Sequence, residues 1–110
     1  MLDVINSGSE LFCVRCEVRG DRAQVSFVGE LDPYTDHYAD DALDALAKQG
    51  IRHFRIDASD LTYVGSSGVN VLARLLSAHP TSIVTLVGAS PLFLRLLRAT
   101  GMDAHLALIS

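Results

Sequence analysis

Two adjacent serines stand between glycines in residues 61–72, LTYVGSSGVNVL, with apolar residues on either side. The pattern indicates that a strand ends shortly before the glycines and that a helix begins at the serines. A hydroxyl group at such a junction has three possible uses. It can cap the helix, act as a catalytic nucleophile, or accept a phosphoryl group that switches a charge on and off.

Helix capping accounts for part of the pattern. Ser66 is placed to act as the N-cap, where its oxygen accepts a hydrogen bond from an unpaired amide, an interaction worth about 1 kcal/mol. Ser67 then lies in the first helical turn. Gly68 weakens the same turn by roughly 1 kcal/mol relative to alanine. A glycine here therefore indicates a requirement other than helix stability, for example the close approach of another molecule to the backbone.

Catalysis by these serines is not favoured. The nucleophile elbow of hydrolases reads G-x-S-x-G, whereas this stretch reads G-S-S-G. A phosphate-binding P-loop needs a lysine after its glycines, and GSSGVN has none. No histidine is spaced to serve as a base for Ser66; the histidines are His37, His53, His79 and His105. We therefore expect a protein that is not an enzyme and that needs no cofactor.

The two cysteines form a C-x-x-C pattern, Cys13 and Cys16. That spacing is typical of redox and zinc sites when a turn or helix start brings both sulfurs to one side. Here the surrounding residues alternate as in a strand, where positions three apart point to opposite faces. No second cysteine or histidine pair completes a metal site. We expect two reduced thiols.

The composition is that of a single globular domain of 110 residues, with 49% hydrophobic and 20% charged residues. The formal charge of −4 and the scattered basic residues argue against nucleic acid and favour a protein partner. No apolar run approaches the roughly 18 to 20 residues that span a bilayer. The start, MLDVINSGSE, lacks the pattern of a signal peptide, so we expect a cytoplasmic location.

Alternating or apolar stretches predict four strands and a possible fifth, at residues 11–18, 23–28, 51–58, 82–87 and 106–109. The first two strands flank a Gly-Asp turn and should form an antiparallel hairpin. Residues 82–87 are almost wholly apolar, which is typical of a parallel strand covered on both faces. The final stretch either adds a strand or packs as a tail. Residues 1–9 are expected to be a flexible N-terminus of the one domain, residues 1–110.

Three helices are expected between these strands. Asp32-Pro33 and Ser90-Pro91 each have the form of an N-cap followed by proline at the first helical position. The expected buried faces contain Ala39, Ala42, Leu43 and Leu46; Val69, Leu72, Leu75, Leu76 and His79; and Leu92, Phe93, Leu96 and Leu97.

The order ββαβαβα(β) predicts an α/β fold with a mixed, mostly parallel sheet of four to five strands and three to four flanking helices. The antiparallel hairpin should form its N-terminal edge. The helix starts should gather at one end of the sheet, where functional groups of such folds usually lie.

The run IDASDLTYVGSSGVNVLARLL, residues 56–76, resembles the central segment of STAS domains, the fold of bacterial anti-sigma factor antagonists. Gly29-Glu30-Leu31-Asp32 is similar to the G-E-L-D that precedes the first helix of that family. Residues 86–91, LVGASP, and residues 96–102, LLRATGM, are similar to the strand before its third helix and to its closing motif. The resemblance extends over the chain from about residue 10 and implies the STAS-type fold.

The resemblance also implies a mechanism. In these antagonists the partner anti-sigma factor, a serine kinase of the histidine-kinase-like ATPase fold, phosphorylates the first serine of the motif, which is Ser66 here. The unphosphorylated form binds the anti-sigma factor and frees the sigma factor, the phosphorylated form does not bind, and a separate serine phosphatase resets the switch. The implied partner-binding residues are Asp32, Tyr34, Thr35, Gly65, Ser66, Ser67, Gly68 and Asn70.

One position departs from the family pattern, because Gly65 stands where the family has an aspartate. This change removes a carboxylate that can orient the serine, and it loosens the backbone. Two alternatives follow. One is a STAS subunit that docks on a membrane lipid-transport ATPase, which Gly65 slightly favours. The other is an antagonist that binds without being phosphorylated, with the two cysteines as a means of control. Leu94, between the stripe residues of the last helix, is a candidate for self-association.

Overall fold

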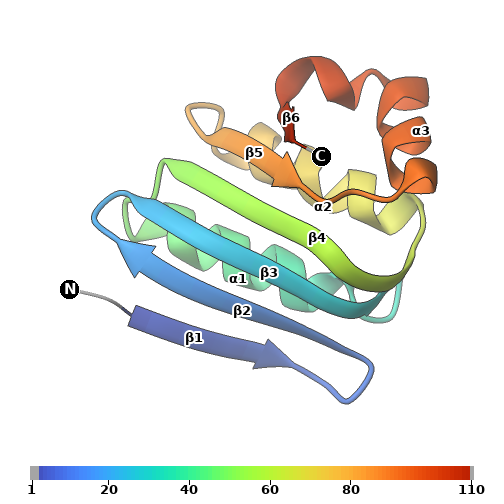
Figure 1. The fold of residues 1–110 in the computed structure, drawn as a ribbon. Helices are drawn as coiled ribbons and strands as arrows, with labels where there is room; N and C mark the ends of the chain where they lie inside the picture. Colours follow the sequence, from blue (N-terminus) through green and yellow to red (C-terminus); the bar gives the residue numbers. More distant parts are fainter. Residues whose placement is uncertain (1–2, 110) are drawn as a thin grey trace.

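The computed structural model describes residues 3–109 and contains one six-stranded sheet whose strands lie in sequence order. The strands are β1 (Asp3–Gly8), β2 (Phe12–Arg19), β3 (Arg22–Leu31), β4 (His53–Val64), β5 (Ile83–Val87) and β6 (Ala107–Ile109). Strands β1 to β3 pair antiparallel, and β3 to β6 pair parallel. The helices are α1 (Asp36–Lys48), α2 (Ser66–Ala78), α3 (Pro91–Thr100) and the short 3₁₀ helix η1 (Met102–His105). The predicted mixed α/β architecture is confirmed, with one strand more than expected (Figure 1).

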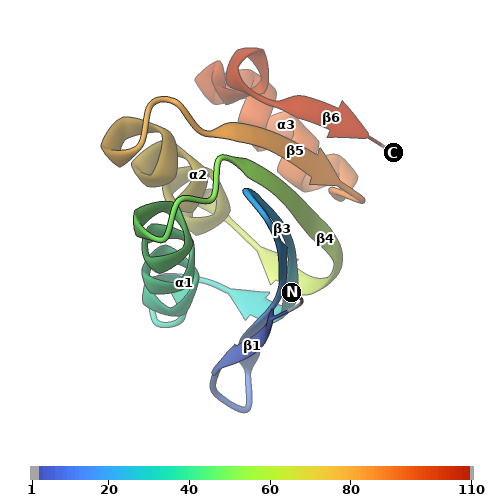
Figure 2. The same cartoon turned by 90° about the vertical axis from the view of Figure 1, so that its left-hand side faces the viewer.

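The core lies between the sheet and the helices, with α1 and α2 against one face of the sheet (Figure 2). Alternate strand residues point to this face and are buried: Phe12, Val14, Cys16, Ala23, Val25, Phe27, Phe54, Ile56, Ala58, Val84 and Leu86. They meet the buried helix residues Ala39, Leu43, Leu46, Val69, Leu72, Leu75, Phe93 and Leu97. The apolar residues that recur every two positions in the strands and every three to four positions in the helices therefore pack into one core.

The opposite face of the sheet is open, which corrects the expectation that residues 82–87 are covered on both faces. Ile83 points to this open face and is 51% exposed. The reason lies in the topology. When successive parallel strands are added in one direction through right-handed crossovers, the connecting helices are placed on the same side of the sheet. A sheet with helices on both faces needs a reversal in strand order, and this one has none between β3 and β6.

The N-terminal residues also differ from expectation. Residues 3–8 form β1, which pairs with β2 from Asp3 opposite Val18 to Gly8 opposite Cys13. The edge strand is therefore β1 and not part of the β2–β3 hairpin. The segment DVINSG shows little apolar alternation, so its strand character depends on the hydrogen-bonding edge that β2 offers. Residues 1 and 2 of the expected flexible segment lie outside the described part of the chain.

Both ends of α3 lie where the sequence predicts them, at the Ser90-Pro91 cap and at Gly101. The Ser90 side chain accepts a hydrogen bond from the amide of Phe93 at 3.2 Å, and Pro91 follows it. Gly101 ends the helix with φ of 77°. Leu94 is only partly exposed on this helix, whereas Leu92, expected on the buried face, is 51% exposed.

The two cysteines point to opposite faces of β2, as the alternation predicts. Cys16 is buried in the core, and this burial raises the pKa of its thiol to about 11. Cys13 lies on the open face, and both cysteines are free. Within residues 3–109 no group of three or more His, Cys, Asp or Glu side chains is arranged to hold a metal ion.

Candidate docking site at the start of helix α2

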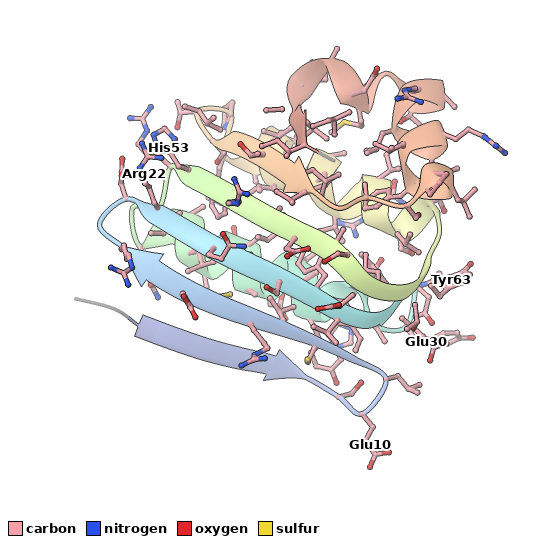
Figure 3. All side chains as sticks on the ribbon, viewed as in Figure 1. Glu10, Arg22, Glu30, His53 and Tyr63 are labelled. Atoms are coloured by element: carbon pink, nitrogen blue, oxygen red, sulfur yellow. The ribbon has the colours of Figure 1, made fainter. Side chains whose placement is uncertain are left out.

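The strands β3 and β4 end side by side, with Leu31 in register with Val64. The residues that follow them, Asp32 and Gly65, are therefore brought together, because neighbouring strands lie about 4.8 Å apart. Residues 30–35 and 63–70 together form what is here called the rim. Figure 3 shows two of its side chains, Glu30 and Tyr63, close to each other at this end of the sheet.

A compact hydrogen-bond network fixes the first half of the rim. One carboxylate oxygen of Asp32 accepts hydrogen bonds from the amides of Tyr34 at 2.8 Å and Thr35 at 3.0 Å. In return, Thr35 Oγ1 accepts from the amide of Asp32 at 3.1 Å and donates to the carbonyl of Glu30 at 2.6 Å. The arrangement is reciprocal, as in a capping box. It holds the turn rigidly and leaves Tyr34 86% exposed at its tip.

This network changes the expected start of the first helix. Asp32 caps a turn that precedes the helix, and α1 itself begins at Asp36 with Thr35 as its N-cap. The Asp-Pro signal thus marks the turn, because the amides that Asp32 satisfies belong to that turn. Thr35 is only 4% exposed, so its role is inside the fold.

The two serines of the second half have different environments. Ser66 is the first residue of α2 and is exposed, whereas Ser67 is only 4% exposed. The N-cap is Gly65, which corrects the expectation that Ser66 caps the helix. In the described part of the chain, no hydrogen bond engages the Ser66 hydroxyl. The Ser66 hydroxyl group is therefore accessible from solvent.

Gly68 is explained by internal packing, which corrects the expectation that an outside molecule approaches it. The residue is buried, and a Cβ atom at this position would lie 2.6 Å from Cγ2 of Val64 and 3.0 Å from Cζ of Phe93. Real Cβ contacts are essentially never as short as the first of these. The missing side chain lets α3 and the end of β4 pack closely against the first turn of α2.

No comparable steric conflict requires a glycine at position 65. Its backbone is extended, with φ of −120° and ψ of −152°, a conformation open to any residue. An added Cβ would meet the Tyr63 hydroxyl at 3.0 Å, and that atom is the far end of an exposed side chain. The position where the family has aspartate is thus the N-cap of α2, and here it carries no capping side chain.

Five of the eight predicted partner-binding residues reach the surface, and three do not. The surface residues are Asp32, Tyr34, Gly65, Ser66 and Asn70; the buried ones are Thr35, Ser67 and Gly68. Asn70 lies four residues after Ser66 and therefore shares its face of the helix. The other three are buried, so their side chains are not part of the exposed surface of the rim.

Two exposed apolar side chains in or near the rim are not among the predicted site residues. Tyr63 is 53% exposed and precedes the buried Val64, so strand alternation already points it outward. Leu92 is 51% exposed and precedes Phe93, whose ring lies against Gly68. Its helical spacing had suggested a buried position. Of the two, Tyr63 lies beside the start of α2, because its hydroxyl is the nearest atom to a Cβ added at Gly65.

The rim is acidic. Residues 30–35 and 63–70 contain Glu30 and Asp32 but no lysine or arginine. The first turn of α2 has no acidic residue, so no side-chain carboxylate of that turn competes for the positive end of the helix dipole beside Ser66.

Comparisons with known proteins agree on the fold. The family model described as "Mlab, STAS domain" matches residues 14–110. No curated protein matches the sequence. An anti-sigma factor antagonist from Mycobacterium paratuberculosis has a similar structure, with 22% identity and a TM-score of 0.74, covering 99% of this chain and 86% of that one.

The antagonist SpoIIAA is also similar in structure. Its unphosphorylated form has 18% identity and a TM-score of 0.71, covering 88% of each chain. The phosphorylated form of this Bacillus cell fate determinant has 18% identity and a TM-score of 0.67, covering 88% of this chain and 91% of that one. No helix within residues 3–109 is both long and apolar enough to cross a membrane.

Proposed function

Because the chain belongs to the STAS domain family, we propose that it is an anti-sigma factor antagonist that docks through the rim and is switched off by phosphorylation of Ser66. The proposed partner is an anti-sigma factor that is itself a serine kinase of the histidine-kinase-like ATPase fold. Binding it would release the sigma factor, and a serine phosphatase would restore the docking form. The antagonist contributes a surface and a substrate hydroxyl, and no catalysis of its own, in the cytoplasm.

The observation that carries this proposal is the contrast between the two serines. Ser66 is exposed at the first position of α2, and Ser67 beside it is 4% exposed. A kinase that docks on the rim would therefore reach one hydroxyl and not the other. The position that the STAS resemblance assigns to phosphorylation is the accessible one.

The electrostatics of the rim fit a switch that acts on docking and not on folding. A phosphoserine carries about −1.5 to −2 charges at neutral pH. At the first position of α2 this charge meets unpaired amides and the positive end of the helix dipole, so the domain tolerates it. A partner that buried the same charge without a cation would lose about 3 to 5 kcal/mol, which is more than a hundredfold in affinity.

The proposal is tested by incubating the purified chain with kinase-type anti-sigma factors and ATP, followed by mass spectrometry. We expect one added phosphate, on Ser66. The Ser66→Ala variant should gain none, and Ser67 should stay unmodified in both proteins. Phosphate on Ser67, or none under conditions where the kinase phosphorylates a cognate antagonist, would contradict the proposal.

A second candidate function is a STAS subunit that docks on the ATPase of a membrane lipid-transport system. Two observations favour it: the capping carboxylate is absent at Gly65, and the matching family model has the Mlab description and not that of an antagonist. Such a subunit would use the same rim without needing a phosphorylated serine. Copurification of the tagged chain with a transport ATPase, unaffected by kinase and ATP, would support this function instead.

A further inference from the structure

The open face of the sheet carries a group of cationic side chains at the end where β3 to β5 begin. Strand register aligns two rows across four strands: Arg19, Arg22, His53 and Ile83 in the first, and Glu17, Gln24, Arg55 and Thr85 in the second. In each strand these residues alternate with the buried ones, so they point away from the helices. Arg22 and His53 lie at the end of the sheet opposite Glu30 and Tyr63 (Figure 3).

These two rows line a hollow. It has a volume of about 290 Å³, and its remaining lining residues are Ala23 and Phe54. That volume is near the lower end of the range of roughly 300 to 1,000 Å³ for small-molecule sites. Because the lining side chains stand on four paired strands, the positions of their backbones are fixed by the sheet.

The arginines of the hollow form no salt bridge within the described part of the chain. Among the side chains that the structure describes, the salt bridges to lysine or arginine involve Lys48 and Arg74, and none involves Arg19, Arg22 or Arg55. The pKa of Asp57, on the same face of β4, is lowered by hydrogen bonds from Ser59 and to a lesser degree by the charge of Arg55. Glu17 is the one carboxylate in the described lining, so three arginines and one glutamate give the hollow a formal charge of +2. The whole chain carries −4. The hollow is therefore a local exception to the charge of the protein.

The clustered arginines also destabilise the folded protein when no ligand is bound. Arg19 stands directly opposite Arg22 in the β2–β3 ladder, and like charges in that position are destabilising. Beside them, Nε2 of His53 lies 3.9 Å from Oδ2 of Asp21. Arg19 and Arg22 repel each other and form no salt bridge in the described part of the chain. Such a destabilising pair is expected where the charges bind a ligand.

We propose that this hollow binds a small soluble organic phosphate monoester. Guanidinium groups match phosphate oxygens through paired N–H donors, and a doubly charged phosphate balances the formal charge of the lining. Gln24 and Thr85 flank Arg55 in its row and supply further hydrogen-bonding groups. Ile83, half exposed beside His53, offers apolar contact to the organic part of the ligand. The hollow is separate from the rim, so this inference does not rest on the proposed function.

The test uses the full chain labelled with ¹⁵N and titrated with phenyl phosphate at low ionic strength, followed by amide chemical shifts. We expect saturable shifts at Gln24, Arg55 and Thr85, with the amide of Ser66 unmoved. Because a hydrogen bond to a charged group contributes roughly 1.5 to 3 kcal/mol, Arg55→Gln should weaken binding about tenfold or more. Inorganic phosphate, which lacks the apolar part, should bind more weakly than phenyl phosphate.

Two variants separate a specific site from general attraction. Arg95→Gln removes one positive charge from the exposed side of α3 and should leave the affinity nearly unchanged. Glu17→Gln removes the carboxylate of the hollow and should strengthen binding. The inference is overturned if shifts do not saturate, or if Arg55→Gln and Arg95→Gln weaken binding equally. It is also overturned if vesicles containing phosphatidic acid bind while phenyl phosphate does not, because the ligand class would then be a membrane lipid.

Discussion

The ring of Phe93 closes over the backbone of Gly68, so that a Cβ atom added there would lie 3.0 Å from the Phe93 Cζ atom. This contact joins the start of α3 to the first turn of α2, the turn that begins with the exposed Ser66. It makes the glycine a requirement of packing, although glycine is a poor residue for a helix interior. The geometry of the rim therefore depends on a buried contact between two helices.

Substituting Gly68 by alanine should destabilise the fold. Overpacking typically costs about 1 to 3 kcal/mol, and the gain in helix propensity recovers only about 1 kcal/mol of it. Urea denaturation followed by circular dichroism measures the difference. Gly65→Ala is the matched control, since the added Cβ there meets only the end of the Tyr63 side chain. A Gly68→Ala variant more stable than Gly65→Ala would show that the contact between α2 and α3 has room for the added methyl group.

Placing the family's aspartate at position 65 should stabilise the domain. The extended backbone of Gly65 is compatible with an N-cap, and Asp there can accept from the free amides of the first turn of α2. The cap and the reduced freedom of the unfolded chain together contribute about 1 kcal/mol. The Gly65→Asp variant should therefore have a higher urea midpoint. A lower midpoint would mean that the displacement of Tyr63 outweighs the cap.

The reciprocal bonds between Asp32 and Thr35 predict a loss of stability when the hydroxyl is removed. Thr35→Val keeps the shape of the side chain but removes the hydroxyl that pairs with the partly buried amide of Asp32 and carbonyl of Glu30, a cost of about 1 to 3 kcal/mol. Thr62→Val, at an exposed position of β4, is the control and should change stability little. Equal urea midpoints for the two variants would indicate that the network does not stabilise the turn.

The contact between Asp44 and His79 predicts a dependence of stability on pH. The two side chains lie 2.7 Å apart and join α1 to the end of α2. Hydrogen bonds from His79 and then from Lys48 lower the pKa of Asp44 in the folded state. The stabilisation is therefore present above the pKa of the unfolded chain and is lost as pH falls through the lower folded pKa.

Asp44→Asn should accordingly lower the melting temperature at neutral pH, and the difference from the wild type should shrink below about pH 4. Melting curves at several pH values give this difference directly. The exposed Asp41→Asn on the same helix serves as the control and should show a smaller effect. A gap that stays constant down to pH 2 would mean that the carboxylate charge of Asp44 is not responsible.

The fold was largely predictable because its local signals agree with its long-range contacts. The paired strands around Gly20-Asp21, the Ser90-Pro91 cap and the apolar stripes all correspond to observed elements. The predictions that failed concern features that neighbouring strands and helices determine. The β1 strand has a weak pattern of its own and gains its hydrogen bonds from β2. Ile83 is exposed because the connecting helices all lie on the other face of the sheet. The sequence of one strand does not show on which face the helices lie.

The elements that carry the candidate site residues were predicted from the sequence, whereas the burial of those residues was not. Register brings Asp32 beside Gly65, as expected for helix starts that gather at one end of a sheet. Sequence spacing could not show that Ser67 and Gly68 face inward, because that depends on where α3 packs. For the same reason the purpose of Gly68 was misassigned to an outside molecule. The exposed Tyr63 could have been found from strand alternation before Val64.

The central claim is that charge at Ser66 abolishes docking without unfolding the domain. The most direct measurement compares the affinities of wild type, Ser66→Ala, Ser66→Glu and Ser77→Glu for the proposed partner, a kinase-type anti-sigma factor. Ser77→Glu places the same charge at the far end of α2. We predict that Ser66→Glu loses a hundredfold or more in affinity, as expected for an uncompensated buried charge, while its melting curve stays close to that of the wild type. Ser66→Ala and Ser77→Glu should bind normally. If Ser66→Glu binds as tightly as Ser77→Glu, the phosphorylation switch is contradicted.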